Sequence, residues 1–280
     1  LWPDSDRATG TTGDRQTSAD RRIIELSNDR ESVPATAKIV IAADGLGGSF
    51  LNGSREFRRI AARDSLIGAG VVLARAPVDY CRGTIYMAVG RGGYVGQVML
   101  ENGALDVAAA LDRRVLAGGG NQAEAARRIV ERAGLPWPNE LSRLKWHGTP
   151  PLTRRLAHVA APRVFVVGDA GAYVEPFTGE GMTWAMLTGA AVAPIACEAI
   201  DGDPQRAAER WESTHRRLLG RRMFVCRALC RLLRSERLTG AAIGLAERWP
   251  WLASPLMRLL AGSRTALPHI LDPMFSSSAS

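Results

Sequence analysis

The sequence predicts a mixed α/β protein with two kinds of sheet and a helical carboxyl-terminal region. Two near-continuous apolar runs, at residues 38–43 and 163–168, predict strands that are buried on both faces. Between them, shorter apolar segments separated by glycine-containing turns indicate an antiparallel sheet. From residue 180 onward the pattern becomes helical. We therefore expect two layers of different character, followed by helices.

The expected elements follow one another in a simple order. A short strand at 22–26 and a polar turn at 28–32 precede the first apolar run. Strands are then expected at 66–75, 83–90, 93–100 and 104–111, and Asn102-Gly103 is a strong hairpin signal between apolar runs. A helix over 121–133 ends at Gly134, and residues 139–162 are expected to form an irregular connection, with room for one more strand.

In the second half of the chain, the sequence predicts a strand at 163–168, a long helix at 180–200, a further helix to about 237, and helical pieces near 241–248 and 255–261. Residues 1–20 and the serine-rich end are expected to be unstructured. The apolar stretch from Met182 to Cys197 is shorter than the roughly 20 residues that cross a bilayer, so we interpret it as a helix packed inside the protein.

Composition narrows the class of protein. The net charge of +8 comes mostly from arginine and favours anionic partners such as nucleotide phosphates or anionic lipid. Nucleic acid is not expected, because no aromatic platform accompanies the charge. Cys226 and Cys230 are four residues apart, but no second pair of Cys or His residues is present to complete a metal site with them, so we expect no metal. We interpret the four cysteines as buried thiols of a reducing, cytoplasmic compartment.

The most specific motif follows the second buried strand. Gly168, Asp169 and Ala170 come at its carboxyl end, and the run from Pro176 to Met182 contains Gly179 and Gly181 before the helix. A carboxylate at this place can accept hydrogen bonds from hydroxyl groups of a nucleotide cofactor. The glycines let a flat ring approach the free N–H groups of the helix start, whose partial positive charge would stabilise a reduced flavin. The alternative is a glycine-rich turn with an aspartate cap.

Asp44 and Gly45 end the first buried strand in a similar way. The pair alone is a weak signal, because many surface turns contain it. Two strands that each end in an acid beside glycine, with an antiparallel sheet between them, form a more specific constellation.

These motifs resemble the Asp-Gly and Gly-Asp fingerprints of flavoprotein monooxygenases and related reductases. The runs 179–182 and 92–96 are most similar to the geranylgeranyl reductase-like branch. The resemblance covers about residues 21–200 and implies a partial Rossmann-like FAD-binding domain (21–60 and 155–200), an antiparallel-sheet substrate domain (61–154) and a helical region (201–280). The cofactor-binding residues that it implies are Asp44, Gly45, Gly168, Asp169, Pro176, Gly179, Glu180, Gly181, Met182 and Thr183.

Within that resemblance, Asp169 would hold the ribityl hydroxyl of FAD, and the backbone of 179–183 would face the isoalloxazine ring. Asp44 and Gly45 would lie near the pyrophosphate or support the region that a nicotinamide cofactor visits. The family opens with a Gly-x-Gly-x-x-Gly turn that receives the ADP half of FAD, and no such turn precedes Asp44. We therefore expect this chain to lack the amino-terminal section that carries it.

The resemblance implies an FAD-dependent oxidoreductase, with NAD(P)H as electron donor. It would be a reductase or monooxygenase of an isoprenoid, polyketide or aromatic molecule lying against the sheet at 66–111. One alternative is an α/β nucleotide-binding domain with another ligand. Another is a non-catalytic remnant that binds lipid or an anionic membrane through the basic helix 206–237. The enzyme could also contact a membrane surface through this helix. That helix could equally pack on the core with a solvated arginine face. Its expected apolar stripe is Trp211, Leu218, Val225, Leu229 and Leu232.

Overall fold

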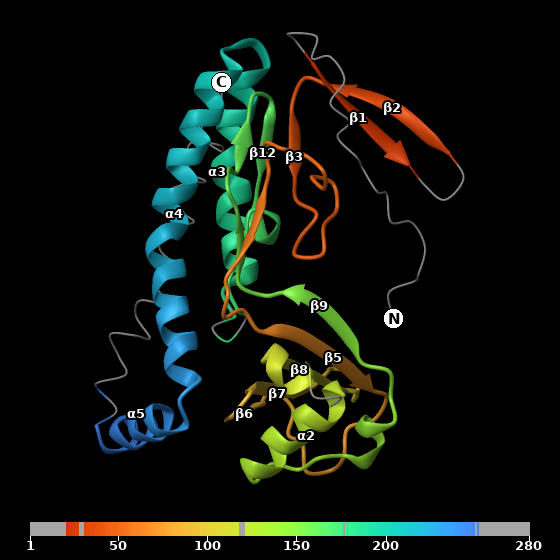
Figure 1. Cartoon of the computed structure of the whole chain (residues 1–280), viewed down its shortest axis with the longest axis vertical. Helices are drawn as coiled ribbons and strands as arrows, with labels where there is room; N and C mark the ends of the chain where they lie inside the picture. The colour runs from red at the N-terminus through yellow and green to blue at the C-terminus, as the bar shows by residue number, and fades with distance from the viewer. Residues whose placement is uncertain are drawn as a thin grey trace, which may run out of the picture. The chain divides into compact units, whose positions relative to one another are not determined.

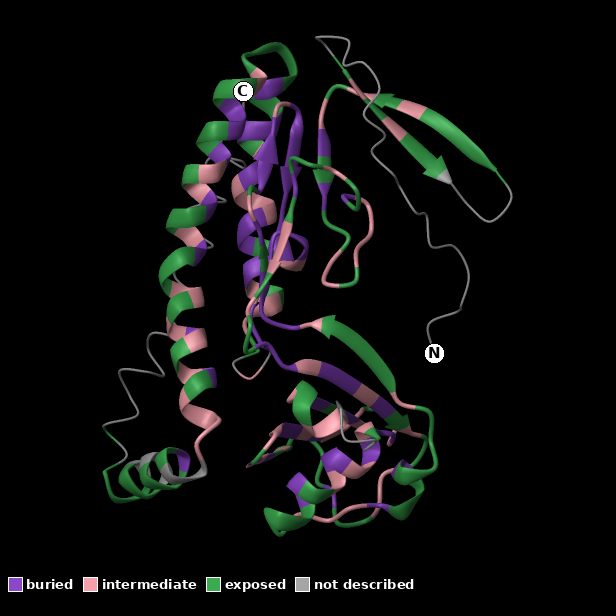
Figure 2. Cartoon of the chain, viewed as in Figure 1, coloured by how far each residue is buried: buried purple, intermediate pink, exposed green. Residues whose placement is uncertain are grey.

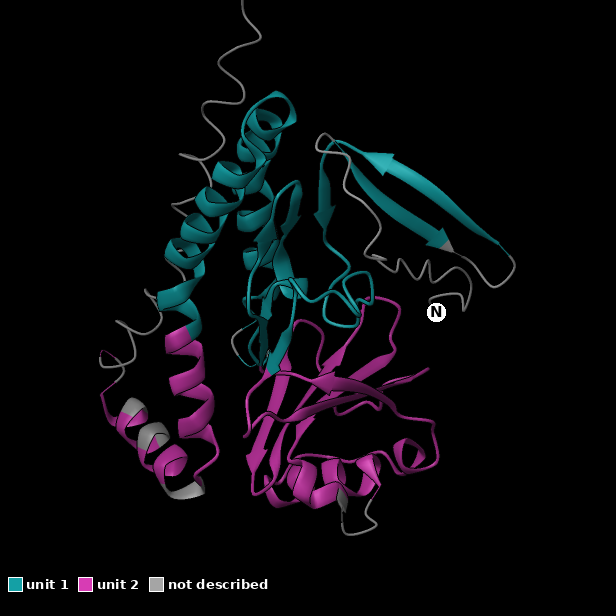
Figure 3. Ribbon diagram, turned by 45° about the horizontal axis from the view of Figure 1, so that its top comes forward, with its two compact units in different colours: residues 1–60, 154–223, 259–280 teal, residues 61–153, 224–258 magenta. Residues whose placement is uncertain are grey.

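A computed structural model of the chain describes residues 21–27, 31–117, 121–175, 177, 179–249 and 251. The described residues form two compact units (Figure 3): unit 1 contains 21–60 and 154–223, and unit 2 contains 61–153 and 224–251. The expected boundaries at 60/61 and 154/155 lie within one residue of these limits, whereas the expected helical region from 201 is divided between the units at 223/224. The roles assigned to the domains stay predictions. The segments expected at 1–20, 255–261 and the serine-rich end lie outside the described residues.

Unit 1 contains a small sheet in which the two predicted apolar strands are neighbours (Figure 1). Its order is β11 (Ala160–Ala161), β12 (Val164–Val166) and β3 (Val40–Ala42), and β12 runs parallel to β3. The chain segments that follow β3 and β12 therefore leave the sheet at the same edge. β12 is buried throughout, as predicted, but β3 is an edge strand of this sheet and Ile41 is 46% exposed, so the prediction of burial on both faces was wrong for β3.

Two helices cover this sheet: α3 (Gly181–Asp201) and α4 (Pro204–Leu233). Phe165 of β12 and Trp211 of α4 are fully buried, and the Trp211 indole N–H donates to the Val166 carbonyl at 3.0 Å. By length and composition α3 could cross a membrane. Its residues Val192 and Ile195, however, lie in the core of unit 1, in agreement with the packed helix that the sequence predicts.

The rest of unit 1 is a ribbon of β1 (Arg22–Ser27) with β2 (Ser32–Ala37) and a three-stranded sheet of order β13 (Ala172–Tyr173), β10 (Arg154–Leu156) and β4 (Arg59–Ala61). The segment 139–162 is more regular than expected. It holds a 3-10 turn, η1 (Asn139–Ser142), and the strands β9 (His147–Pro151), β10 and β11, of which the sequence indicated at most one. These strands are two to five residues long, and so short a run carries little periodicity.

Unit 2 is built on a five-stranded antiparallel sheet of order β6 (Ile85–Gly90), β7 (Gly93–Met99), β8 (Leu105–Leu111), β5 (Ile67–Leu73) and β9. The four strands that the sequence predicts here are confirmed. Asn102 and Gly103 lie in the turn between β7 and β8, where Gly103 has a φ of +82°. Helix α2 (Gln122–Arg132) covers one face of this sheet, and the short helix α1 (Arg113–Ala117) precedes it.

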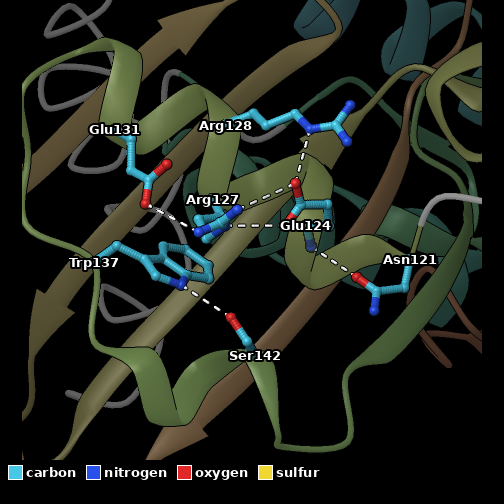
Figure 4. A network of polar contacts seen from close by, with 7 residues as sticks. All are labelled: Asn121, Glu124, Arg127, Arg128, Glu131, Trp137 and Ser142. Carbon is cyan, nitrogen blue, oxygen red and sulfur yellow. Dashed lines mark hydrogen bonds and ion pairs between the residues drawn. The ribbon is translucent and has the colours of Figure 1, made fainter.

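Helix α2 begins where the sequence predicts, at Asn121. The Asn121 side chain accepts a hydrogen bond from the Glu124 N–H at 2.7 Å and so caps the helix. Figure 4 shows the ion pairs that follow on its outer face: Glu124 with Arg127 and Arg128, and Arg127 with Glu131. Exposed pairs of this kind contribute little stability each. The buried side chains, such as Ile129 and Val130, hold α2 to the sheet.

The buried face of α4 differs from the predicted stripe. Of the predicted residues only Trp211 is fully buried. The buried residues of α4 are Ala207, Ala208, Trp211, His215, Leu219, Cys226 and Cys230. Cys226 and Cys230 are buried thiols as expected, but Cys81 and Cys197 are exposed. The predicted helix to about 237 is interrupted after α4, and α5 (Glu236–Arg248) begins with Ser235 as its cap. In the described part of the chain, no group of three His, Cys, Asp or Glu residues could hold a metal ion.

Candidate functional site

The Gly-Asp motif forms a tight turn, η2 (Gly168–Ala170), directly after β12. Gly168 has a φ of +58°, and a Cβ at this position would lie 3.2 Å from the Ala185 Cβ of α3. The Gly168 N–H donates to the buried Thr188 hydroxyl at 2.9 Å, and that hydroxyl donates to the Trp184 carbonyl at 2.7 Å. Only glycine fits this close approach at a left-handed φ, so the turn is fixed against α3.

Asp169 lies beside the first residue of α3. A Cβ on Gly181 would be 3.6 Å from Asp169 Oδ1 and 3.8 Å from Tyr173 Cε2, so the absence of a side chain leaves this space open. Asp169 Oδ1 is buried and has no hydrogen-bond partner among the described residues. Burial raises the pKa of this carboxyl group, and the positive charge of Arg154 opposes the rise. A buried acceptor without a donor is costly, and a hydroxyl group of a ligand would satisfy it.

The start of α3 offers backbone donors at the same place. Its cap residue, Glu180, makes no capping hydrogen bond with its side chain, and the first turn contains no acidic residue. The Glu180 carboxylate instead accepts from the Trp184 indole N–H at 3.0 Å. Among the described residues, the N–H groups of Gly181, Met182 and Thr183 therefore receive no cap from the Glu180 side chain, and they lie at the positive end of a 21-residue helix. This end can bind a negatively charged or electron-rich group.

The chain enters α3 through Gly179, which has a φ of +69° and open space where a Cβ would be. Met182 is 79% exposed, whereas Thr183 is half-buried. The structure thus brings together Gly168, Asp169, Gly181, Met182 and Thr183 of the predicted set. Pro176 lies outside the described residues.

The Asp-Gly pair is arranged differently, because Asp44 serves its own loop. Its carboxylate accepts from the Phe50 N–H at 3.0 Å, and a Cβ on Gly48 would lie 2.1 Å from that carboxyl group. Gly45 takes a left-handed φ of +71° in the turn that precedes Gly48. Arg59 donates to the Gly48 carbonyl and holds the loop from β4. Asp44 therefore stabilises a compact loop at the edge where β3 ends.

Arg154 is a residue of this site that the sequence analysis did not single out. It is 9% exposed, lies on β10 opposite Tyr173 of β13, and interacts electrostatically with both Asp44 and Asp169. Burial lowers the pKa of Arg154, the neighbouring Arg59 lowers it further, and the two carboxylates raise it. Arg154 thus connects the two motifs. The alternation of buried Arg154, exposed Arg155 and buried Leu156 is a strand signal, but three residues are too few to find it.

Unit 2 has a second surface of interest, the sheet face that α2 does not cover. Three small residues lie side by side across the strands, because Gly70 pairs with Ala108 and Ala108 with Gly96, and the larger Met87 pairs with Gly96 at the end of the row. The row beside them contains Ile85, which is 68% exposed, Val98 and Val72, with the acidic Asp106 between Val98 and Val72. Apart from Asp106 the side chains of these two rows are apolar or absent, which suits an apolar or flat molecule.

The chain is similar to known proteins in sequence and in fold. No family model matches the chain. Over 166 residues the chain is 26% identical to a digeranylgeranylglycerophospholipid reductase of Methanoculleus marisnigri, a match that covers 59% of the chain and 41% of the relative. The chain thus spans about two fifths of the length of this curated relative.

Solved structures of flavin enzymes have a similar fold. The flavin-dependent brominase Bmp2 superposes with a TM-score of 0.66 at 14% identity, over 93% of this chain and 69% of that one. PqsL of Pseudomonas aeruginosa, assigned as an FAD-dependent monooxygenase, has a TM-score of 0.58 at 16% identity, over 82% of this chain and 65% of that one. The chain therefore shares the fold of these flavin enzymes.

The predicted mixed α/β class is confirmed, and so is the predicted resemblance to reductases and monooxygenases. The binding role of each predicted residue remains a prediction. The geometry gives it a physical basis in the second motif, where an unsatisfied carboxylate oxygen and uncapped N–H groups converge. The Asp44 carboxylate already accepts a hydrogen bond from the Phe50 N–H. At Gly45, by contrast, no atom lies within 4 Å of the place where a Cβ would be, so a ligand could approach the backbone there.

Proposed function

We propose that this chain carries the flavin-ring site and the substrate surface of an FAD-dependent oxidoreductase. The observation that supports the proposal most strongly is the buried, unsatisfied Asp169 Oδ1 next to Gly181 at the uncapped start of α3. Asp169 would accept a hydrogen bond from the ribityl chain, and the N–H groups of Gly181, Met182 and Thr183 would face the electron-rich edge of the ring. FAD would supply the redox chemistry, with NAD(P)H as donor.

The residues of this chain would bind and orient the cofactor. Thr188 keeps the Gly168 turn in place, and the absence of side chains at Gly179 and Gly181 lets a ring approach the backbone. Arg154 favours the ionised form of Asp169, which is the better hydrogen-bond acceptor.

The proposed substrate is an apolar small molecule, an isoprenoid, polyketide or aromatic compound. The apolar face of β5, β6, β7 and β8 supports this proposal, since it presents Val72, Ile85 and Met87 to solvent around a row of small residues. Similarity to a reductase of an isoprenoid lipid supports reduction of a double bond, and the fold shared with monooxygenases supports oxygenation. In the presence of NAD(P)H, saturation of a double bond without oxygen would identify a reductase. Oxygen consumption that depends on the substrate would identify a monooxygenase.

Flavin titration of the purified chain tests the binding site. FMN is expected to bind about as tightly as FAD, because the described site faces the ring and ribityl chain. Asp169→Asn is expected to weaken binding about 10- to 100-fold, the range for losing a hydrogen bond to a charged group. Asp201→Asn is the matched control, since that carboxylate lies at the other end of α3 and its side chain is 86% exposed. Equal flavin affinity in Asp169→Asn and the wild type would contradict the proposal.

The pH dependence of the same titration tests the role of Arg154. Arg154→Gln removes the positive charge that opposes the effect of burial on Asp169, so the pKa of Asp169 is expected to rise further. A protonated carboxyl group is a weaker acceptor, and flavin affinity should therefore fall more at pH 6 than at pH 8 in this variant. A loss of affinity that is the same at both pH values would show that Arg154 acts only through the local structure.

A further inference from the structure

The face of the unit 2 sheet that α2 does not cover carries a carboxylate among its apolar rows. Asp106 of β8 stands opposite Val98 of β7 and Val72 of β5. Asp106 is half-buried and Ala108 is exposed, whereas Val107 between them is buried, because alternate residues of a strand point to opposite faces. Along β5, too, buried residues stand beside intermediate and exposed ones (Figure 2). The Asp106 side chain therefore belongs to the open face.

Aspartate is an unfavourable residue at this position. It is depleted in strands, and the side chains of Val98 and Val72 offer it no hydrogen bond. Burial raises the pKa of the Asp106 carboxyl group, whereas a hydrogen bond from the Val107 N–H lowers it. In the described part of the chain, no Lys, Arg or His side chain is among the groups that act on this pKa. A residue that disagrees with its local structure is expected at a functional site.

Other carboxylates of unit 2 have cationic partners within the unit. Asp64 pairs with Arg234 at 3.0 Å, and Glu124 pairs with Arg128 at 2.9 Å. The Asp106 carboxylate accepts one backbone hydrogen bond, although two carboxylate oxygens offer about four acceptor sites. A half-buried acceptor is costly to leave unpaired, and a donor on a ligand would reduce that cost.

The space beside this carboxylate admits a flat apolar group. Gly70 and Ala108 carry little or no side chain, and a Cβ on Gly70 would meet the Val107 carbonyl oxygen at an ordinary 3.5 Å. The Met87 sulfur, by contrast, lies 3.1 Å from the place of a Cβ on Gly96, so this flexible side chain covers Gly96 and bounds the open area. A ligand can therefore lie flat on the apolar residues while one polar group reaches the carboxylate.

We propose that Asp106 is a specificity-determining residue, which binds the hydroxyl or amino group of an otherwise apolar molecule on this sheet face. Charge complementarity selects the polar group, because a carboxylate without a cation beside it attracts a hydrogen-bond donor and repels a carboxylate or phosphate. The apolar rows select the rest of the molecule. The inference rests on the proposed function, which assigns the substrate to this sheet, and it narrows the substrate class to apolar compounds that carry a donor.

NMR titrations of the whole ¹⁵N-labelled chain with three bicyclic probes test this proposal. 2-Naphthol and 2-naphthylmethylamine carry a donor, whereas 2-methoxynaphthalene has the same rings and no donor. The wild type is expected to bind at least one donor probe about tenfold more tightly than the ether, the lower end of the range for a hydrogen bond to a charged group. The amides of Gly70 and Ala108 should shift, because they lie beside Asp106 on the open face. Asp106→Val should abolish the preference, since valine keeps an apolar surface without an acceptor.

Glu101→Gln is the matched control, because it removes an exposed carboxylate from the turn between β7 and β8. It should keep the preference of the wild type, and Asp106→Val should still bind the ether, which shows that this variant is folded. Preference for one donor probe alone would support the proposal and distinguish an alcohol from an amine. Equal affinity of the wild type for all three probes would overturn it, as would a donor preference that Asp106→Val retains or the absence of saturable shifts on this face. No flavin is present, so these outcomes are independent of FMN binding at Asp169.

Discussion

Replacement of Thr188 by valine is expected to loosen the turn that holds Asp169. The Thr188 hydroxyl is fully buried, accepts from the Gly168 N–H at 2.9 Å and donates to the Trp184 carbonyl at 2.7 Å. Valine has nearly the same shape but no hydroxyl, so the buried Gly168 N–H would have no acceptor. A buried donor without a partner costs about 1–3 kcal/mol, and we expect the free energy of unfolding to fall by about 2 kcal/mol.

Urea denaturation followed by tryptophan fluorescence measures this loss, and hydrogen exchange of the Gly168 amide locates it. Thr188→Ser is the matched variant, because it keeps the hydroxyl and removes only a methyl group. The Gly168 amide should exchange faster in Thr188→Val and remain protected in Thr188→Ser. The reasoning fails if Thr188→Val is as stable as the wild type, or if both variants expose the Gly168 amide equally.

Two further substitutions test the packing of unit 1. Burial lowers the pKa of His215 to about 4, so the unfolded chain binds a proton more readily than the folded chain between pH 6.5 and 4. The contribution of neutral His215 to the free energy of unfolding is complete above pH 6.5 and falls by about 3 kcal/mol as the pH falls to 4. In urea titrations at several pH values, His215→Leu should therefore lose less stability than the wild type between pH 6.5 and 4. The same pH dependence of stability in both proteins would contradict this explanation. Gly48→Ala would place a Cβ 2.1 Å from the Asp44 carboxyl group and should lower the free energy of unfolding by about 1 kcal/mol or more, whereas Gly47→Ala, with open space around it, should not. Equal stability of the two alanine variants would show that Asp44 does not hold its loop.

Strong patterns made much of the fold predictable. The strands of unit 2 are apolar runs separated by glycine-containing turns, and the end of β7 and the start of β8 flank the Asn102-Gly103 signal. Helix α2 has a side-chain cap at Asn121, one of the better local signals for a helix start. The strands β9, β10 and β11 were not predicted individually, because their pairing depends on partners distant in the chain, such as β5 for β9.

The candidate site was predictable where one motif carries it. Gly168 and Asp169 are adjacent in sequence, and Gly181 begins the next helix, so a local pattern describes the turn and the helix start. Arg154 was missed because its place beside Asp169 depends on the pairing of β10 with β13. The buried face of α4 was misplaced for a related reason, since alanine, histidine and cysteine occupy it and hydrophobicity alone favours leucine and valine.

The most direct test of the flavin proposal is an NMR titration of the ¹⁵N-labelled chain with FMN. The amides of Gly181, Met182 and Thr183 are expected to show the largest saturable shifts, because they form the uncapped start of α3 beside Asp169. Asp169→Asn should reduce these shifts at the same FMN concentration. Saturable shifts confined to other parts of the chain, or no saturable shift at any concentration, would contradict the assignment of this helix start as the flavin site.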